Sequence, residues 1–104
     1  MITVRGTTPT IIFRLPFQTD TIRKLEIYFG QPELLFTKTE EDCTFDENKV
    51  QVTLSQAETL DLNENLTLKI QLRFVFNNGS VGATKKISGE VEDIMKDGEI
   101  DVGD

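Results

Sequence analysis

The chain has 104 residues, enough for one domain with one hydrophobic core and too few for two. A hydrophobic content of 38%, with seven Phe, one Tyr and no Trp, predicts a folded domain and excludes a disordered chain. The formal net charge is −7, from 18 acidic and 11 basic residues, so the surface repels phosphate backbones and anionic lipid head groups. We therefore expect neither nucleic acid nor a membrane as a partner.

Apolar and polar residues alternate along most of the chain, as is typical of strands with one buried face. The apolar positions of the first predicted strands are Ile11, Phe13 and Leu15; Leu25, Ile27 and Phe29; Leu34 and Phe36; and Val50, Val52 and Leu54. Turn-forming residues separate these segments at 16–20, 30–32 and 46–48. Each segment is predicted to be a short strand.

One short helical turn is predicted at 55–58. The Ser55 hydroxyl can accept a hydrogen bond from the Glu58 amide, while the Glu58 carboxylate accepts one from the Ser55 amide. This turn precedes the longest alternation in the chain, in which Leu66, Leu68, Ile70, Leu72, Phe74 and Phe76 share one face. That segment is predicted to be the central strand.

A hairpin is predicted after the central strand. Asn78-Gly79 favours a tight turn because both residue types tolerate positive φ, and residues 81–92 are expected to return antiparallel. Short strands at spacings of about ten residues favour an all-β fold, an immunoglobulin-like antiparallel β-sandwich of about seven strands with one short helical turn. A small barrel is the alternative. We expect a single domain over 1–96 and an acidic C-terminal tail over 97–104 that frays.

The residue types needed for most catalytic and metal sites are scarce. The chain has no His, and Cys43 is the single cysteine, which excludes histidine-based catalytic triads, histidine-containing zinc sites and an internal disulfide. Cys43 is expected to be a small buried apolar residue. No glycine-rich phosphate loop occurs. We predict no catalytic residue, no cofactor site and no metal site, and hence a protein that is not an enzyme.

Calcium is the one ion that the acidic residues leave open. Residues 93–104 resemble a calcium loop only faintly, because Met95 stands where an oxygen ligand is required. A looser site among Glu40, Asp42, Asp46 and Glu47 is a minor hypothesis.

Four apolar or aromatic residues are candidates for a partner interface. Leu35 and Val75 face away from the predicted core on strands expected to be neighbours, so they are predicted to form one apolar patch. Ile12 and Tyr28 are predicted to do the same on the opposite sheet.

Several short stretches are similar to a family of small proteins from phages and prophages of Gram-positive bacteria. They are Arg5-Gly6-Thr7-Thr8-Pro9-Thr10, Leu15-Pro16-Phe17, Ile22, Thr39, Asp42-Cys43-Thr44, Leu54-Ser55-Gln56-Ala57-Glu58-Thr59, Gln71-Leu72-Arg73 and Asp97-Gly98-Glu99-Ile100. The chain also resembles the N-terminal sandwich module of siphophage baseplate proteins. It carries one such module without a receptor-binding domain, so direct host recognition is not expected.

The resemblance implies a structural or adaptor subunit of a phage tail or baseplate region. Such a subunit would contact copies of itself and other virion proteins, as a homo-oligomer or within a larger assembly. The start of the chain lacks a secretion leader and no apolar run reaches 18 residues, so we expect it in the host cytoplasm during assembly and then in the virion. The alternatives are a carbohydrate- or surface-binding module, which the lack of Trp disfavours, and an acidic nucleic-acid mimic, which interspersed basic residues disfavour.

Overall fold

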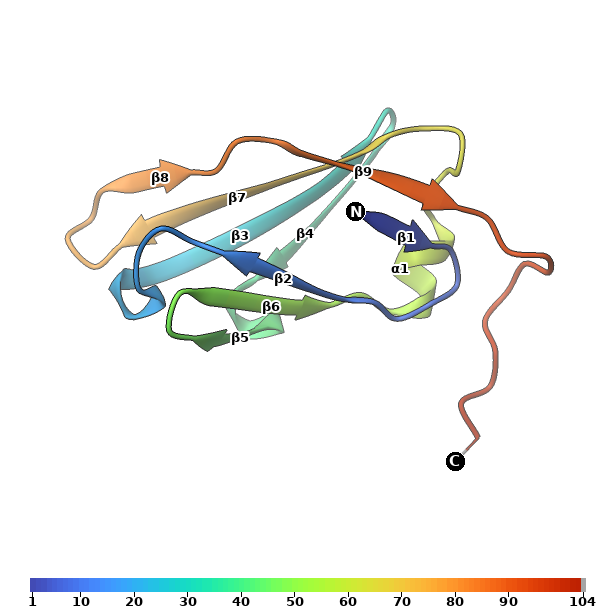
Figure 1. Ribbon diagram of the computed structural model, residues 1–104, viewed down its shortest axis with the longest axis horizontal. Helices are drawn as coiled ribbons and strands as arrows, with labels where there is room; N and C mark the ends of the chain where they lie inside the picture. The colour runs from blue at the N-terminus through green and yellow to red at the C-terminus, as the bar shows by residue number, and fades with distance from the viewer. Residues whose placement is uncertain (104) are drawn as a thin grey trace.

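The computed structural model, which describes residues 1–103, folds the chain into two β-sheets around one core (Figure 1). The larger sheet has the order β1-β9-β7-β3-β4, with β8 paired to β7, and the smaller sheet has the order β2-β6-β5. The larger sheet contains β1 (Ile2–Val4), β3 (Ile22–Gln31), β4 (Leu34–Thr39), β7 (Leu68–Phe76), β8 (Val81–Ala83) and β9 (Ile87–Glu92). The smaller sheet contains β2 (Thr10–Arg14), β5 (Cys43–Asp46) and β6 (Lys49–Thr53). Strands pair antiparallel, apart from β1 with β9, which are parallel.

The core lies between the sheets because alternate side chains of facing strands point into it. The larger sheet contributes Leu25, Ile27, Phe29, Leu68, Ile70, Leu72, Phe74 and Val91, and the segments of the smaller sheet contribute Phe13, Leu15, Val50, Val52 and Leu54. The Phe17 ring packs edge-on against Phe74 and Phe76, at centroid distances of 5.2 and 5.1 Å. Each fully buried large side chain stabilises the fold by about 1.5–3 kcal/mol.

The predicted all-β sandwich is confirmed, with nine strands in place of about seven. The strands β1 and β5 were not predicted, because β1 has three residues and buries the polar Thr3, while β5 is mostly exposed. The predicted strand over 81–92 is two strands. Ala83 pairs with Arg73 on β7, and Ile87 pairs with Ile70. Ala83 and Ile87 are four positions apart but their partners only three, so one extra residue interrupts the pairing.

The predicted helical turn is confirmed as α1 (Gln56–Leu60) with its capping box. The Glu58 amide donates to Ser55 Oγ at 3.1 Å, and the Ser55 amide donates to Glu58 Oε1 at 2.8 Å. Two 3-10 turns complete the fold, η1 (Thr19–Thr21) and η2 (Glu40–Asp42). The η2 turn carries the chain from β4 in the larger sheet to β5 in the smaller one.

The segment after β9 runs without regular secondary structure along the side of the molecule that carries β1 and α1 (Figure 1). We name residues 93–103 the C-terminal strap. The Arg5 guanidinium donates to Asp93 and to Asp97 of the strap, and the side-chain amide of Gln56 bonds to Ile100. The strap therefore contacts the body at two points, and Asp104, the last residue of the predicted tail, lies outside the described residues.

Candidate functional site on the outer face of the larger sheet

The four predicted interface residues lie on two sheets, but not as predicted. Tyr28 on β3, Leu35 on β4 and Val75 on β7 all belong to the larger sheet, whereas Ile12 on β2 belongs to the smaller one. The prediction that Tyr28 and Ile12 share a sheet is wrong, because β3 lies between β7 and β4. Ile12 is 48% exposed and stands apart from the other three.

The predicted contact between Leu35 and Val75 is also wrong. Leu35 pairs with Gly30 on β3, and Val75 pairs with Lys24 on the same strand. These two partners are six residues apart, which is roughly 20 Å along a strand. Because β4 and β7 both run antiparallel to β3, the start of β4 lies near the start of β7, and Val75 stands near the other end.

The structure instead brings Leu35 together with Tyr28. Both line a shallow hollow around Gly30, along with Lys69, Ile70, Gln71 and Lys86; we name these seven residues the Leu35 hollow. Leu35 is 68% exposed, so its side chain is available to a partner. The Tyr28 hydroxyl donates to Glu26 Oε1 at 2.7 Å, and this bond, with partial burial, raises the pKa of Tyr28 above its usual value.

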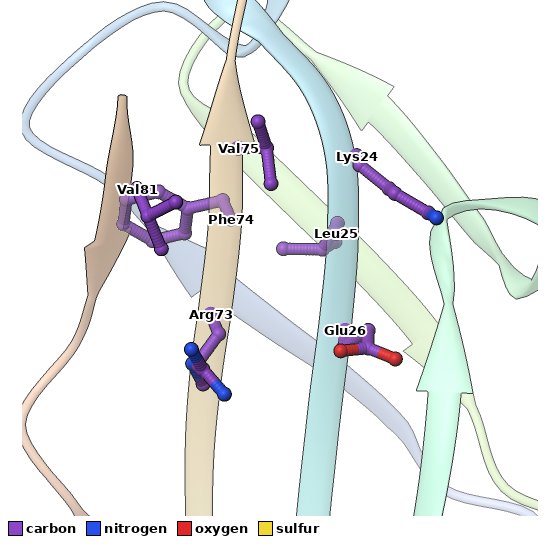
Figure 2. Close-up of a pocket in the computed structure, with 7 residues that line it drawn as sticks. All are labelled: Lys24, Leu25, Glu26, Arg73, Phe74, Val75 and Val81. Carbon is purple, nitrogen blue, oxygen red and sulfur yellow. The ribbon is translucent and has the colours of Figure 1, made fainter. Parts of the chain in front are cut away.

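Val75 lies in a second hollow near the other end of the same face. Figure 2 shows it with Val81 on β8 and with Lys24, Glu26 and Arg73 on the neighbouring strands β3 and β7. Val81 pairs with Val75 and is 61% exposed. This hollow has a volume of about 260 Å³ and is lined by charges of both signs. The Leu35 hollow, in contrast, is lined by positive charges alone.

Two of the four acidic residues considered for calcium, Glu40 and Asp42, accept backbone hydrogen bonds. Glu40 Oε1 accepts from the Leu25 amide at 3.1 Å, and Asp42 Oδ2 accepts from the Thr39 amide at 2.9 Å, which caps η2. Within residues 1–103, no three His, Cys, Asp or Glu side chains are grouped so that they could hold a metal ion.

Cys43 is half-buried beside η2, less deeply than predicted. Its Sγ donates to the Thr39 carbonyl at 3.3 Å. Burial, together with the nearby carboxylates of Asp42 and Glu40, raises the pKa of the thiol to about 11. The thiol is therefore almost entirely protonated near neutral pH and is a poor nucleophile.

Three polar side chains that hold the loops in place were not assigned a role from the sequence. Arg5 donates from Nε to the Leu62 carbonyl at 2.9 Å and from Nη2 to the Leu60 carbonyl at 2.7 Å. The buried Gln31 bonds to Asn63 and Leu66, which fixes the loop that leads into β7. Gln56 holds the strap. The role of Arg5 was not predictable, because the strand just before it, β1, is too short to be recognised in the sequence.

No helix in the described part of the chain is both long and apolar enough to cross a lipid bilayer.

Comparison with known proteins defines the class of fold. The chain matches the crystal structure of a strand-swapped dimer of the Ig-like domain of mouse leukocyte-associated immunoglobulin-like receptor 1. The TM-score is 0.52 and the identity 13%, over 88% of this chain and 85% of that chain. No family model and no curated protein matches. The fold is thus an immunoglobulin-like β-sandwich, as predicted.

Proposed function

We propose that the chain is a non-catalytic structural or adaptor subunit of a phage or prophage tail or baseplate region that acts through protein–protein contacts. Its partners are copies of itself and other virion proteins. It is made in the bacterial cytoplasm and incorporated into the particle. The resemblance of its residues to small phage proteins and baseplate modules motivates the proposal, and the outer face of the larger sheet supports it.

The observation that carries the proposal is the exposed Leu35 framed by lysines. Lys69 and Lys86 both line the Leu35 hollow, and within residues 1–103 neither has a carboxylate within ion-pair distance. An apolar centre with a polar rim is the usual anatomy of a protein interface. Unpaired lysines in a chain of net charge −7 favour an acidic partner surface.

Strand edges offer a second means of contact. In the sheets of the described chain, β4 and β5 each pair with a neighbour on one side, so their other sides present backbone groups. Such edges can add a strand from another subunit. The dimer of the structural neighbour forms by strand swapping, and an edge-mediated homo-oligomer is consistent with this precedent.

The experiment that tests the proposed function is composition analysis of purified particles. Particles are induced from a Gram-positive host that carries the gene, banded by density, and analysed by quantitative mass spectrometry. We expect the chain at a fixed copy number per particle, and defective tails when the gene is deleted. Infectious particles of normal form that lack the chain would contradict the proposal.

A further inference from the structure

We propose that residues 99–102 of the C-terminal strap of one copy bind the Leu35 hollow of the next copy, giving head-to-tail association. The inference deepens the proposed function, on which it rests, by naming both surfaces of the contact and the partner. It is carried by the shape of the hollow, its charge, and the way in which the strap is held.

The hollow exists because Gly30 has no side chain. Gly30 lies between Leu35 on β4 and Lys69 on β7, which are its paired residues. Side chains at neighbouring strand positions on one face normally touch, so a glycine there leaves a gap. A second shallow hollow adjoins it and shares Gly30, Leu35 and Lys69. The two together form an apolar trough with one wall made by the exposed Leu35.

The trough is positively charged at its edge. Lys69 and Lys86 are exposed, and neither hollow that shares Leu35 has a carboxylate in its lining. Lys69 Nζ donates to Ser88 Oγ at 2.6 Å, a bond that leaves its charge uncompensated. The Glu26 carboxylate accepts from the Tyr28 hydroxyl and lines neither hollow. An acidic peptide with apolar side chains suits these surroundings.

The strap presents such a peptide. Ile100 is 75% and Val102 78% exposed, and Glu99 and Asp101 alternate with them. In an extended chain, alternation places the two apolar side chains on one side and the two carboxylates on the other. The distance between Ile100 and Val102 is then about 7 Å, one strand repeat, which matches neighbouring subsites along a sheet.

The strap is already held in place beside and within this segment. The Gln56 side-chain amide donates to the Ile100 carbonyl at 3.0 Å and accepts from the Ile100 amide at 2.8 Å, as a neighbouring strand would. Arg5 holds Asp97 at 2.7 Å, just before this segment. Ordering the segment in advance lowers the entropic cost of binding. Because Gln56 and Arg5 anchor the strap beside α1, the copy that carries it leaves its own hollow open to another copy.

The contact joins two different surfaces, so it is heterologous, and a pair of copies retains one free strap and one free hollow. Such contacts build rings or open chains. A four-residue segment buries far less than the roughly 1,600 Å² of a standard interface, so we expect weak association that gains strength in a repeated array.

The test is a complementation experiment by sedimentation velocity. Gly30→Val fills the hollow; an added Cβ would lie 3.6 Å from Leu35 Cδ1 and 3.7 Å from the Leu34 carbonyl oxygen, which are ordinary contacts. Ile100→Ser with Val102→Ser disables the strap. We expect each variant alone to associate at least about tenfold more weakly than the wild type. Mixed together, they should form a dimer that grows no further, because one supplies the strap and the other the hollow.

Val81→Ser is the matched control, since Val81 is exposed on the same face outside the hollow. It should associate as the wild type does, and thermal unfolding should show that all variants fold. A monomeric wild type at millimolar concentration, a mixture that stays monomeric, or Gly30→Val chains that associate like the wild type would each overturn the inference. The inference would also be overturned if Gly30→Val lost association while the strap variant associated like the wild type. That result would indicate contact between two sheet faces. Each of these results is compatible with the presence of the chain in purified particles, so failure of this inference is distinguishable from failure of the proposed function.

Discussion

Single polar side chains hold the loops of this sandwich, and Arg5 is the clearest case. It bonds the carbonyls of Leu60, at the end of α1, and of Leu62, just after it, together with two carboxylates of the strap, and its side chain is 12% exposed. Replacing it leaves partly buried carbonyls unpaired, which costs about 1–3 kcal/mol. We predict that Arg5→Met lowers the free energy of unfolding by that amount in urea titrations. Arg23→Met, at an exposed arginine without an ion pair among residues 1–103, should change it little, and equal losses would refute this role.

Cys43 allows a second prediction at this scale. With a thiol pKa of about 11, the folded protein carries roughly a hundredfold less thiolate at pH 8 than an ordinary cysteine does. An aromatic disulfide reagent should therefore react with the folded protein much more slowly than with the urea-unfolded chain. Reaction at equal rates would show that the thiol is not shielded by the fold.

Between elements, Lys38 on β4 and Glu58 on α1 form an ion pair at 2.7 Å. Burial opposes ionisation of Glu58, but bonds from Lys38 and Ser55 outweigh it and hold the pKa of Glu58 below its usual value. A lowered pKa stabilises the fold above the pKa of the unfolded state, about 4.3, and this stabilisation is lost as the pH falls through the folded-state pKa. We predict that Glu58→Gln is less stable than the wild type at pH 7 by up to about 1 kcal/mol. Urea titrations should show this difference shrinking below pH 4, and a difference independent of pH would contradict the assignment.

The β7–β8 hairpin depends on a close approach at Gly82. A Cβ there would lie 2.5 Å from Phe74 Cε2 and 3.3 Å from Phe76 Cε2, and both rings pack against Phe17. We predict that Gly82→Ala lowers the free energy of unfolding by about 1–3 kcal/mol, because the rings must shift. Gly30→Ala, where the added atom meets ordinary contacts, is the control. Thermal unfolding that ranks the two variants in the opposite order would count against this packing.

Period-two patterning predicted the elements well where one face is fully buried, as in β3, β6 and β7. The central strand begins at Leu68 and not at Leu66, because the Leu66 carbonyl accepts a bond from Gln31 and the chain turns there. Patterning also identified which side chains face outward, since Leu35 and Ile12 are exposed. It could not place them relative to one another. That depends on strand order, which pairing between distant segments decides and local alternation does not encode.

At the scale of the whole molecule, the chain is an immunoglobulin-like sandwich, and we propose that its larger sheet turns one face to other subunits. Both sheets contribute to the core, while Leu35 and Lys69 beside Gly30 on the outer face are exposed. That division predicts variants that fold normally yet fail to assemble. Leu35→Glu and Ile12→Glu are a matched pair, because both residues are exposed and they lie on opposite sheets.

The most direct measurement is the incorporation of these two variants into particles. A host that lacks the gene is complemented with either variant, and the chain is quantified in purified particles by mass spectrometry. We predict that Ile12→Glu is incorporated like the wild type and that incorporation of Leu35→Glu is reduced at least about tenfold, although both purified proteins unfold at the wild-type temperature. Equal incorporation of the two variants would contradict a role for this face.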